Sequence, residues 1–235
     1  IGFIESLIDF LSTEYNIDSN KVYSMGMSNG GFMSYTLACE LSDKIAAIAS
    51  VTGSMYMDQY LACNCTHPMP VMQIHGTLDF IVPYEGNSEI EAVDDIISYW
   101  ASFNQCEETP VFNEVPDINL IDLCQAEHYV YENGTNGTSV ELYKVIGGGH
   151  TWPGAAIPIA GSNTNQDFNA SEKIWDFFSK YDINGLINNT YLIDLSTEKR
   201  IIKTIDILGK ESNKNGFLIE IYNDGSTKKK YKLNN

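Results

Sequence analysis

Apolar positions along the chain follow two patterns that predict different elements. Short runs rich in apolar and β-favouring residues are typical of buried strands, and apolar residues spaced three or four apart are typical of one face of a helix. The runs occur at residues 21–25, 45–51 and 71–76. The helical spacing occurs at Ile4, Leu7, Ile8 and Leu11, at Met33, Leu37 and Leu41, at Ile90, Val93, Ile97 and Trp100, and at Ile174, Phe177, Phe178 and Tyr181. Because strands alternate with helices, we expect an α/β fold with a parallel sheet covered on both faces.

Two further elements complete this expectation. Residues 129–131 and 140–145 flank a turn of Gly, Asn and Thr, which predicts a hairpin-like insertion before residue 150. The last helix is expected to take Ser171 as its N-cap, with Glu172 and Asp176 near its start.

The strand predicted at residues 21–25 leads directly into a glycine-rich turn. Residues 26–31 read GMSNGG, and the next helix follows them. A serine on a sharp strand-to-helix turn is held clear of its own backbone, and glycines beside it leave the necessary space. We therefore expect Ser28 to be a nucleophile on an elbow shaped by Gly26, Gly30 and Gly31. The backbone N–H of Asn29 is then one donor to the oxyanion.

A nucleophilic serine needs a base, and the chain has four histidines. His150 follows a strand-like run that ends in three glycines, so it is expected on a loop at a strand end. His75 lies inside the run at 71–76, where a hydrogen-bonded strand histidine is the simpler interpretation. His67 and His128 have weaker contexts.

The acid that orients such a histidine is expected at another strand end. Asp79 closely follows the run at 71–76, where a carboxylate can reach over the sheet edge to the histidine ring N–H. Asp58 is the next candidate, but no strand end precedes it. Ser28, Asp79 and His150 come in the chain order that α/β-hydrolases use.

These segments carry a family resemblance. Residues 26–31 (GMSNGG), 75–79 (HGTLD) with 82–84 (VPY), and 147–154 (GGGHTWPG) resemble the secreted polyhydroxyalkanoate-depolymerase and feruloyl-esterase group of α/β-hydrolases. The resemblance covers residues 1–181 and implies an α/β-hydrolase domain that is a carboxylic-ester hydrolase without metal or cofactor. It leaves the ester open among aliphatic polyesters, feruloyl or acetyl groups on plant polysaccharide, and small esters.

The same resemblance implies strands and a second oxyanion donor upstream of Ile1. The chain opens inside an expected helix and has no initiator Met, so we expect a fragment of a longer gene product. A non-catalytic polymer- or carbohydrate-binding relative on the same fold is the alternative function.

Trp152, two residues after the expected base, has two interpretations that the sequence leaves open. Its indole either lies beside the substrate, where aromatic walls suit apolar esters, or packs under the loop that carries His150.

The charge balance changes near residue 186. Residues 1–186 hold 25 acidic residues and 5 lysines, whereas 187–235 hold 6 acidic and 9 basic residues. Residues 182–190 are polar and predict a linker, and residues 191–235 contain short β-like runs that predict a small all-β module. Lys228, Lys229 and Lys230 form a run that is typical of a solvated face, and the acidic remainder argues against nucleic acid.

The tail resembles the C-terminal sorting domains of proteins exported by the type IX secretion system, chiefly at residues 205–209 (IDILG) and 221–225 (IYNDG). That resemblance implies the secretion machinery as a partner and an extracellular or cell-surface location. A β module that binds polymer is the alternative. We expect no transmembrane segment.

Five cysteines cannot all pair within the chain. Cys106 and Cys124 flank an irregular loop and are the expected disulfide, consistent with export to an oxidising space. Cys39 is expected to be a buried free thiol. Cys63 and Cys65, with His67, offer three metal ligands without an evident fourth, so no metal site is expected.

Overall fold

The computed structural model describes residues 1–156, 162–187, 201–212, 216–222 and 225–232. The chain divides into two compact units: residue 1 with residues 19–187, and residues 2–18 with residues 188–235. Residues 188–190 of the expected linker, residues 191–200 of the expected β module and residues 223–224 of the IYNDG motif lie outside the described residues.

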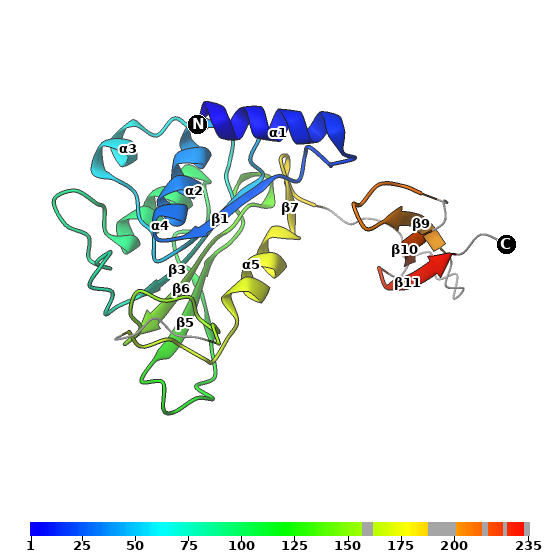
Figure 1. Ribbon diagram of the computed structural model, residues 1–235. Helices are drawn as coiled ribbons and strands as arrows, with labels where there is room; N and C mark the ends of the chain where they lie inside the picture. The colour runs from blue at the N-terminus through cyan, green and yellow to red at the C-terminus, as the bar shows by residue number, and fades with distance from the viewer. Residues whose placement is uncertain (157–161, 188–200, 213–215, 223–224, 233–235) are drawn as a thin grey trace. The chain divides into compact units, whose positions relative to one another are not determined.

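The first unit is built on one six-stranded sheet (Figure 1). Its strands are β1 (Tyr23–Met27), β2 (Ala47–Val51), β3 (Val71–Gly76), β4 (Val111–Glu114), β5 (Gln125–Tyr131) and β6 (Val140–Ile146), in the order β1-β2-β3-β6-β5-β4. β1, β2, β3 and β6 are parallel, and β5 and β4 run antiparallel to their neighbours. The predicted hairpin is confirmed by the pairing of β5 with β6. However, β6 is also a central strand, because it pairs with β3 along its length.

Helices cover both faces of this sheet, as Figure 1 shows. They are α2 (Asn29–Glu40), α3 (Met57–Ala62), α4 (Val93–Phe103) and α5 (Ala170–Phe178). The unit also contains a 3₁₀ turn (Thr135–Gly137) and a pair of short strands, β7 (Tyr181–Asp182) and β8 (Gly185–Leu186). α2 and α4 share one face, where Tyr35 stacks near Trp100 with ring centroids 6.4 Å apart. α5 covers the other face, where Ile174 and Phe177 pack on the core. The strands β2 and β3 are buried along their whole length because both of their faces are covered.

The last helix begins differently from the prediction. Asn169 is the N-cap, and its Oδ1 accepts hydrogen bonds from the N–H groups of Ser171 at 2.9 Å and Glu172 at 3.3 Å. Ser171 already lies inside the helix, so its assignment as the cap was wrong. A short asparagine side chain satisfies the first free N–H groups as well as a serine does, so composition alone does not place the boundary.

The cysteine pairing also differs from the expectation. Cys39 and Cys63 form a disulfide, with their Cα atoms 4.9 Å apart. Cys39 lies in α2 and Cys63 directly follows α3, and Phe32 stacks on Tyr56 to hold these helices together. The pairing therefore depends on helix packing, which the sequence pattern does not reveal. Cys39 is not a free thiol, and Cys63 cannot serve as a thiolate ligand.

Cys106 and Cys124 are free and cannot meet. Cys106 lies beside Gly134, at the turn where β6 begins. Cys124 directly precedes β5, whose first residue pairs with Ile146 at the end of β6. The two thiols thus lie at opposite ends of a seven-residue strand, roughly 20 Å apart at the usual rise per residue. A disulfide requires Cα atoms within about 7 Å, so the expected pairing was wrong.

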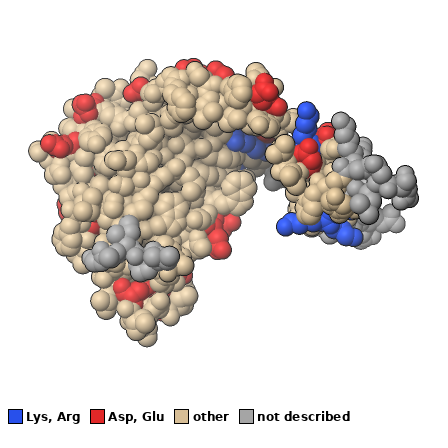
Figure 2. Space-filling view, in the orientation of Figure 1, with Lys and Arg blue, Asp and Glu red and all other residues tan. Residues whose placement is uncertain are grey.

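The second unit contains α1 (Gly2–Glu14), which confirms the predicted helix, and a small antiparallel sheet. The sheet has the order β11-β10-β9, from β9 (Ile201–Asp206), β10 (Gly216–Tyr222) and β11 (Thr227–Lys232). The predicted β character of the tail is confirmed in its described part. Figure 2 shows Lys side chains gathered on this sheet and acidic side chains scattered over the visible face of the first unit. None of the described helices combines the length and hydrophobicity required to cross a membrane.

Candidate active site

Ser28 occupies a strained turn between β1 and α2. Its backbone angles are φ 55° and ψ −118°, a conformation that residues other than glycine rarely adopt. Its N–H donates to the carbonyl of Val51 at 2.9 Å, and its carbonyl accepts from the N–H groups of Gly31 at 2.8 Å and Phe32 at 3.1 Å. The turn is therefore fixed on one side by β2 and on the other by the first turn of α2. Strain held in this way is typical of functional positions.

Two of the three elbow glycines are required by close contacts. A Cβ on Gly26 would lie 2.6 Å from the Cα of Gly30, and a Cβ on Gly31 would lie 3.0 Å from the Cα of Gly53. Gly30 differs, because a Cβ there would meet no atom within 4 Å. Gly53 completes the close approach, since its own Cβ would lie 2.8 Å from the carbonyl oxygen of Ser28. Gly53 belongs to no motif in the sequence, and its signal is its position just after the run at 45–51.

Asn29 is the first residue of α2 and is exposed. In the described part of the chain its backbone N–H makes no hydrogen bond. A free N–H at a helix N-terminus, next to a nucleophile, suits stabilisation of negative charge. The role of Asn29 as an oxyanion donor stays a prediction.

His150 and Asp79 are joined by a hydrogen bond of 2.8 Å between Nδ1 and Oδ2. The side chain of Asp79 is fully buried, whereas that of His150 remains 12% exposed. With Nδ1 facing the carboxylate, the other ring nitrogen of His150 is the one left for substrate chemistry.

This pair forms because the loops after β3 and β6 are bound to one another. Leu78 donates its N–H to the carbonyl of Gly148 at 2.8 Å, and Gly147 donates to Oγ1 of Thr77 at 3.0 Å. A side chain on Gly76 would collide with the backbone of Gly148. The absence of a side chain on Gly76, the last residue of β3, is therefore what allows the histidine loop to approach the acid loop.

Asp79 is held as a carboxylate. Its Oδ1 accepts the N–H groups of Ile81 and Val82, each at 2.9 Å. Burial alone raises the pKa of Asp79, but hydrogen bonds from His75, Val82 and His150 outweigh it and leave the pKa below its usual value. The group therefore stays ionised over the pH range in which a histidine base works.

His75 is a completely buried strand histidine, as the simpler interpretation held. Its Nδ1 lies 2.8 Å from Nε2 of Gln73, and its Nε2 lies 2.9 Å from the carbonyl of Val82 and 3.4 Å from Oδ2 of Asp79. Oε1 of Gln73 accepts the hydroxyl of Tyr35 at 2.8 Å. A buried polar chain thus extends from beneath α2 to the candidate acid.

Ser28, Asp79 and His150 follow the carboxyl ends of β1, β3 and β6, which are parallel and therefore end at the same edge of the sheet. Within the described residues the hydroxyl of Ser28 makes no hydrogen bond to His150, and such contacts often tighten only when substrate binds. The structure thus joins the acid to the histidine and sets the serine at the same edge.

A cavity of about 330 Å³ adjoins His150. Its wall includes Leu78, Phe80 and Ile81, whose exposed fractions are 49%, 86% and 71%. Three large apolar side chains exposed together next to a candidate base are characteristic of a binding wall. These three residues were not predicted as part of the site, although the Leu-Asp-Phe-Ile order around Asp79 was the available signal.

Trp152 lies apart from that wall. Its Nε1 donates to Oγ of Ser171 at 3.1 Å, and its ring packs against the core cluster under α5. These contacts favour the interpretation in which the indole supports the loop that carries His150.

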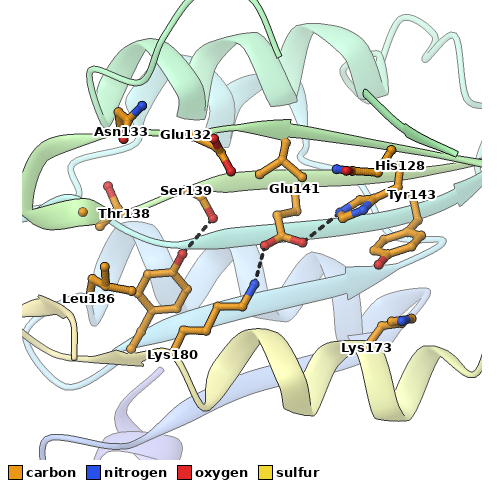
Figure 3. Close-up of a pocket in the computed structure, with 14 residues that line it drawn as sticks. His128, Glu132, Asn133, Thr138, Ser139, Glu141, Tyr143, Lys173, Lys180 and Leu186 are labelled. Atoms are coloured by element: carbon orange, nitrogen blue, oxygen red, sulfur yellow. Dashed lines mark hydrogen bonds and ion pairs between the residues drawn. The ribbon is translucent and has the colours of Figure 1, made fainter. Parts of the chain in front are cut away.

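A larger cleft, of about 600 Å³, lies elsewhere, between the β5–β6 pair and α5 (Figure 3). Glu141 accepts from Lys180 at 3.0 Å and lies 2.9 Å from Nε2 of His128. Burial raises the pKa of Glu141, but the hydrogen bond to His128 and the charge of Lys180 lower it by more. The pKa of Glu141 therefore lies below its usual value. Glu141 is thus already paired with Lys180 and His128, and Ser28, Asp79 and His150 do not line the cleft.

The remaining alternatives lie away from the strand ends. Both ring nitrogens of His67 face backbone carbonyls, of Pro68 at 2.8 Å and Ser42 at 2.6 Å. Asp58 lies in α3, where its Oδ1 accepts the N–H of Gln59. Neither is positioned to serve Ser28.

The parallel strands, the covering helices and the strained strand-to-helix turn define an α/β-hydrolase fold. Residues 1–112 match the family model described as phospholipase/carboxylesterase. Comparison with curated proteins finds esterases at low identity. The chain is 25% identical over 186 residues to the bifunctional acetylxylan esterase/xylanase XynS20E of Neocallimastix patriciarum, 28% over 172 residues to the putative esterase NocK of Nocardia uniformis subsp. tsuyamanensis, and 29% over 161 residues to feruloyl esterase B of Piromyces equi.

These alignments cover 79%, 67% and 64% of this chain but only 24%, 50% and 28% of the respective relatives. The chain therefore spans half or less of the length of these relatives. Among solved structures, an acetyl xylan esterase from Aspergillus awamori aligns with 76% of this chain and 66% of its own, at 15% identity and a TM-score of 0.48.

Proposed function

We propose that the protein is a serine carboxylic-ester hydrolase that acts through an acyl-enzyme, with Ser28 as nucleophile, His150 as base and Asp79 as its orienting acid. The observation that carries this proposal is the 2.8 Å hydrogen bond between Asp79 and His150 at the sheet edge where the strained Ser28 turn lies. The esterase names of the relatives support the reaction class.

The reaction follows from what each group can donate or accept. His150 takes the proton of the Ser28 hydroxyl as the oxygen attacks the ester carbonyl, and Asp79 stabilises the resulting imidazolium. The N–H of Asn29 binds the developing oxyanion. His150 then gives its proton to the leaving alcohol, and a water molecule attacks the acyl-enzyme by the same steps to release the acid and restore Ser28.

The proposed substrates are polyhydroxyalkanoate-like polyesters or feruloyl and acetyl esters of plant polysaccharide. The second group is supported by relatives named as acetylxylan and feruloyl esterases. The apolar wall of Leu78, Phe80 and Ile81 supports a substrate with an apolar group next to the scissile ester.

Secretion belongs to the same proposal. We infer that the small β9–β11 sheet belongs to a sorting signal of the type IX secretion machinery and that the enzyme acts outside the cell or at its surface. Its support is the tail resemblance and the β structure of the described tail. Deleting residues 191–235 in the source organism should retain the enzyme inside the cell, and unchanged export would contradict the inference.

The test of the esterase proposal is a substrate panel on the full-length protein that contains this chain. The panel comprises p-nitrophenyl butyrate, methyl ferulate, acetylated xylan and polyhydroxybutyrate, each with wild type, Ser28→Ala and Ser98→Ala. Ser98 is an exposed serine on α4 whose hydroxyl donates to the carbonyl of Asp94 in its own helix, so its variant is the matched control. Hydrolysis that Ser28→Ala abolishes and Ser98→Ala retains is the expected result. Full activity in folded Ser28→Ala would overturn the mechanism.

A non-catalytic polymer- or carbohydrate-binding relative is the alternative function. It predicts that the wild type pulls down with acetylated xylan or polyhydroxybutyrate and hydrolyses none of the esters in the panel.

A further inference from the structure

We propose that His75 is a positioning residue for the candidate acid, holding the Asp79 carboxylate in the orientation that His150 requires. The inference rests on the proposed serine esterase mechanism. His75 touches neither Ser28 nor the cavity beside His150, so any effect on the reaction passes through Asp79.

The proton of His75 is placed by its partners. Oε1 of Gln73 accepts from Tyr35, so its Nε2 is the donor, and it donates to the carbonyl of Gly53 and to Nδ1 of His75, each at 2.8 Å. Because Nδ1 accepts, the ring proton lies on Nε2. That N–H faces the carbonyl of Val82 at 2.9 Å and Oδ2 of Asp79 at 3.4 Å.

The carboxylate is consequently held on all sides. Its Oδ2 faces two histidine rings, His150 at 2.8 Å and His75 at 3.4 Å, and its Oδ1 accepts two backbone N–H groups. Val82 gives its N–H to Asp79 and its carbonyl to His75, which closes a ring of contacts around the acid. A carboxylate with donors on both oxygens cannot rotate without losing several hydrogen bonds, which fixes the direction of Oδ2.

The same series of buried hydrogen bonds extends to the turn that carries Ser28. Gln73 donates to the carbonyl of Gly53, and the Cα of Gly53 lies so close to the elbow that an added Cβ would stand 2.8 Å from the carbonyl oxygen of Ser28. One buried amide therefore contacts both the residue that supports the elbow and the histidine that supports the acid. This arrangement sets the acid and the nucleophile against a common support, as an accurately assembled site requires.

The chain offers a matched control in the cleft of Figure 3. His128 also lies on a strand and also faces a buried carboxylate, with Nε2 2.9 Å from Oε2 of Glu141, but it lies outside the candidate site. His75→Phe and His128→Phe each remove a ring with two nitrogens from such a pair. His75→Gln is the conservative variant, because its amide nitrogen can donate near the position of Nε2.

The experiment measures kcat and KM for p-nitrophenyl butyrate on the full-length protein, with the proton NMR signal of the N–H that His150 shares with Asp79. We expect His75→Phe to lower kcat by about 10²-fold with little change in KM and to weaken or shift that strongly downfield signal. His75→Gln should recover most of the kcat, and His128→Phe should preserve both readouts even if it lowers the melting temperature.

Unchanged kcat and NMR signal in His75→Phe would overturn the proposal, as would an equal loss in His128→Phe. If His75→Phe does not fold, Gln73→Met takes its place. That variant frees Nδ1 of His75 but also removes the hydrogen bond to the carbonyl of Gly53, so its deciding readout is the NMR signal. We expect that signal to shift, and an unchanged signal counts against the proposal. If wild type hydrolyses no ester, the proposed function fails by itself, and the NMR signal still decides whether His75 orders the Asp79–His150 pair.

Discussion

Two regions of the first unit hold a buried carboxylate next to a histidine, but the surroundings of the two pairs differ. At the strand ends, Asp79 binds His150 on a loop whose ring is partly exposed beside a strained serine. In the cleft of Figure 3, Glu141 is bound by both His128 and Lys180, so its charge is already neutralised. The cleft is the larger cavity, at about 600 against 330 Å³.

The difference shows that cavity size and a lowered pKa do not by themselves identify an active site. Both carboxylates have a pKa below the usual value despite burial. Only the strand-end region adds a strained backbone, a histidine with one nitrogen uncommitted, a free helix N–H and an apolar wall. The charged groups in the cleft form a structural ion cluster that ties the segment after α5 to the sheet through Lys180.

The largest expected contrast between the regions is in turnover. Asp79→Asn should lower kcat by about 10⁴-fold, because an amide can no longer hold His150 in the correct tautomer. Glu141→Gln, the matched change in the cleft, should leave kcat within about twofold. Steady-state kinetics on p-nitrophenyl butyrate measures both. An equal decrease of kcat in the two variants would contradict the distinction between the two regions.

The next contrast is in acid stability. Because the pKa of folded Glu141 lies below its ordinary value of 4.5, its stabilisation is fully present above that pH and is lost as the pH falls through the folded pKa. Glu141→Gln should lower the free energy of unfolding by about 2 kcal/mol at pH 7 and flatten its decline in acid. Urea unfolding from pH 7 down to pH 3 measures this slope. A variant curve parallel to that of the wild type would remove the ion cluster as a source of stability.

A smaller contrast lies within the elbow. Gly31→Ala forces a Cβ against Gly53 and should cost about 1–3 kcal/mol in unfolding free energy and lower kcat. Gly30→Ala, one residue earlier in the same helix, has open space and should be neutral or stabilising by up to about 1 kcal/mol. Thermal unfolding and kinetics on the pair separate steric need from sequence motif. Equal tolerance at the two positions would contradict the packing of the elbow.

The smallest expected effect concerns the apolar wall. Phe80→Ala combined with Ile81→Ala should reduce the preference for p-nitrophenyl hexanoate over acetate by about tenfold, since burial of an acyl chain there is lost. Leu186→Ala, which trims an apolar residue of the ion-cluster cleft, should leave that ratio unchanged. The ratio of kcat/KM values for the two esters is the readout. If Leu186→Ala changed this ratio instead, the acyl chain would bind in the ion-cluster cleft and not beside His150.

The sequence predicted those features that local pattern determines. Runs rich in apolar residues predicted the parallel strands β1, β2 and β3, and strand ends followed by Asp79 and His150 predicted a pair that the structure joins at 2.8 Å. It could not predict the Cys39–Cys63 disulfide, because that bond depends on how α2 packs against α3. Nor did local pattern show β6 to be a central strand, since pairing with β3 is a long-range contact.

Within the site, the residues that belong to motifs were predicted from the sequence, and the residues that support them were not. Gly53 and Gln73 support the elbow through backbone proximity and a buried amide, and neither belongs to a recognisable spacing. His75 was correctly predicted to be a bonded strand histidine, but its approach to Asp79 depends on the turn between them. The support around an active site arises from tertiary packing, so one sequence indicates the reacting groups more readily than their neighbours.

The position of β1 in the sheet order has a practical consequence. Among the described strands β1 pairs with β2 alone, so the strand that leads into Ser28 forms a margin of the described sheet. Such margins recruit further strands, and proteins usually blunt them with charge, as the lysines of β11 do for the small sheet. β1 reads Tyr-Ser-Met-Gly-Met and carries no charge. Preparations of this chain by itself should therefore self-associate along β1, and a lysine at the exposed Met25 should keep them monomeric in light scattering.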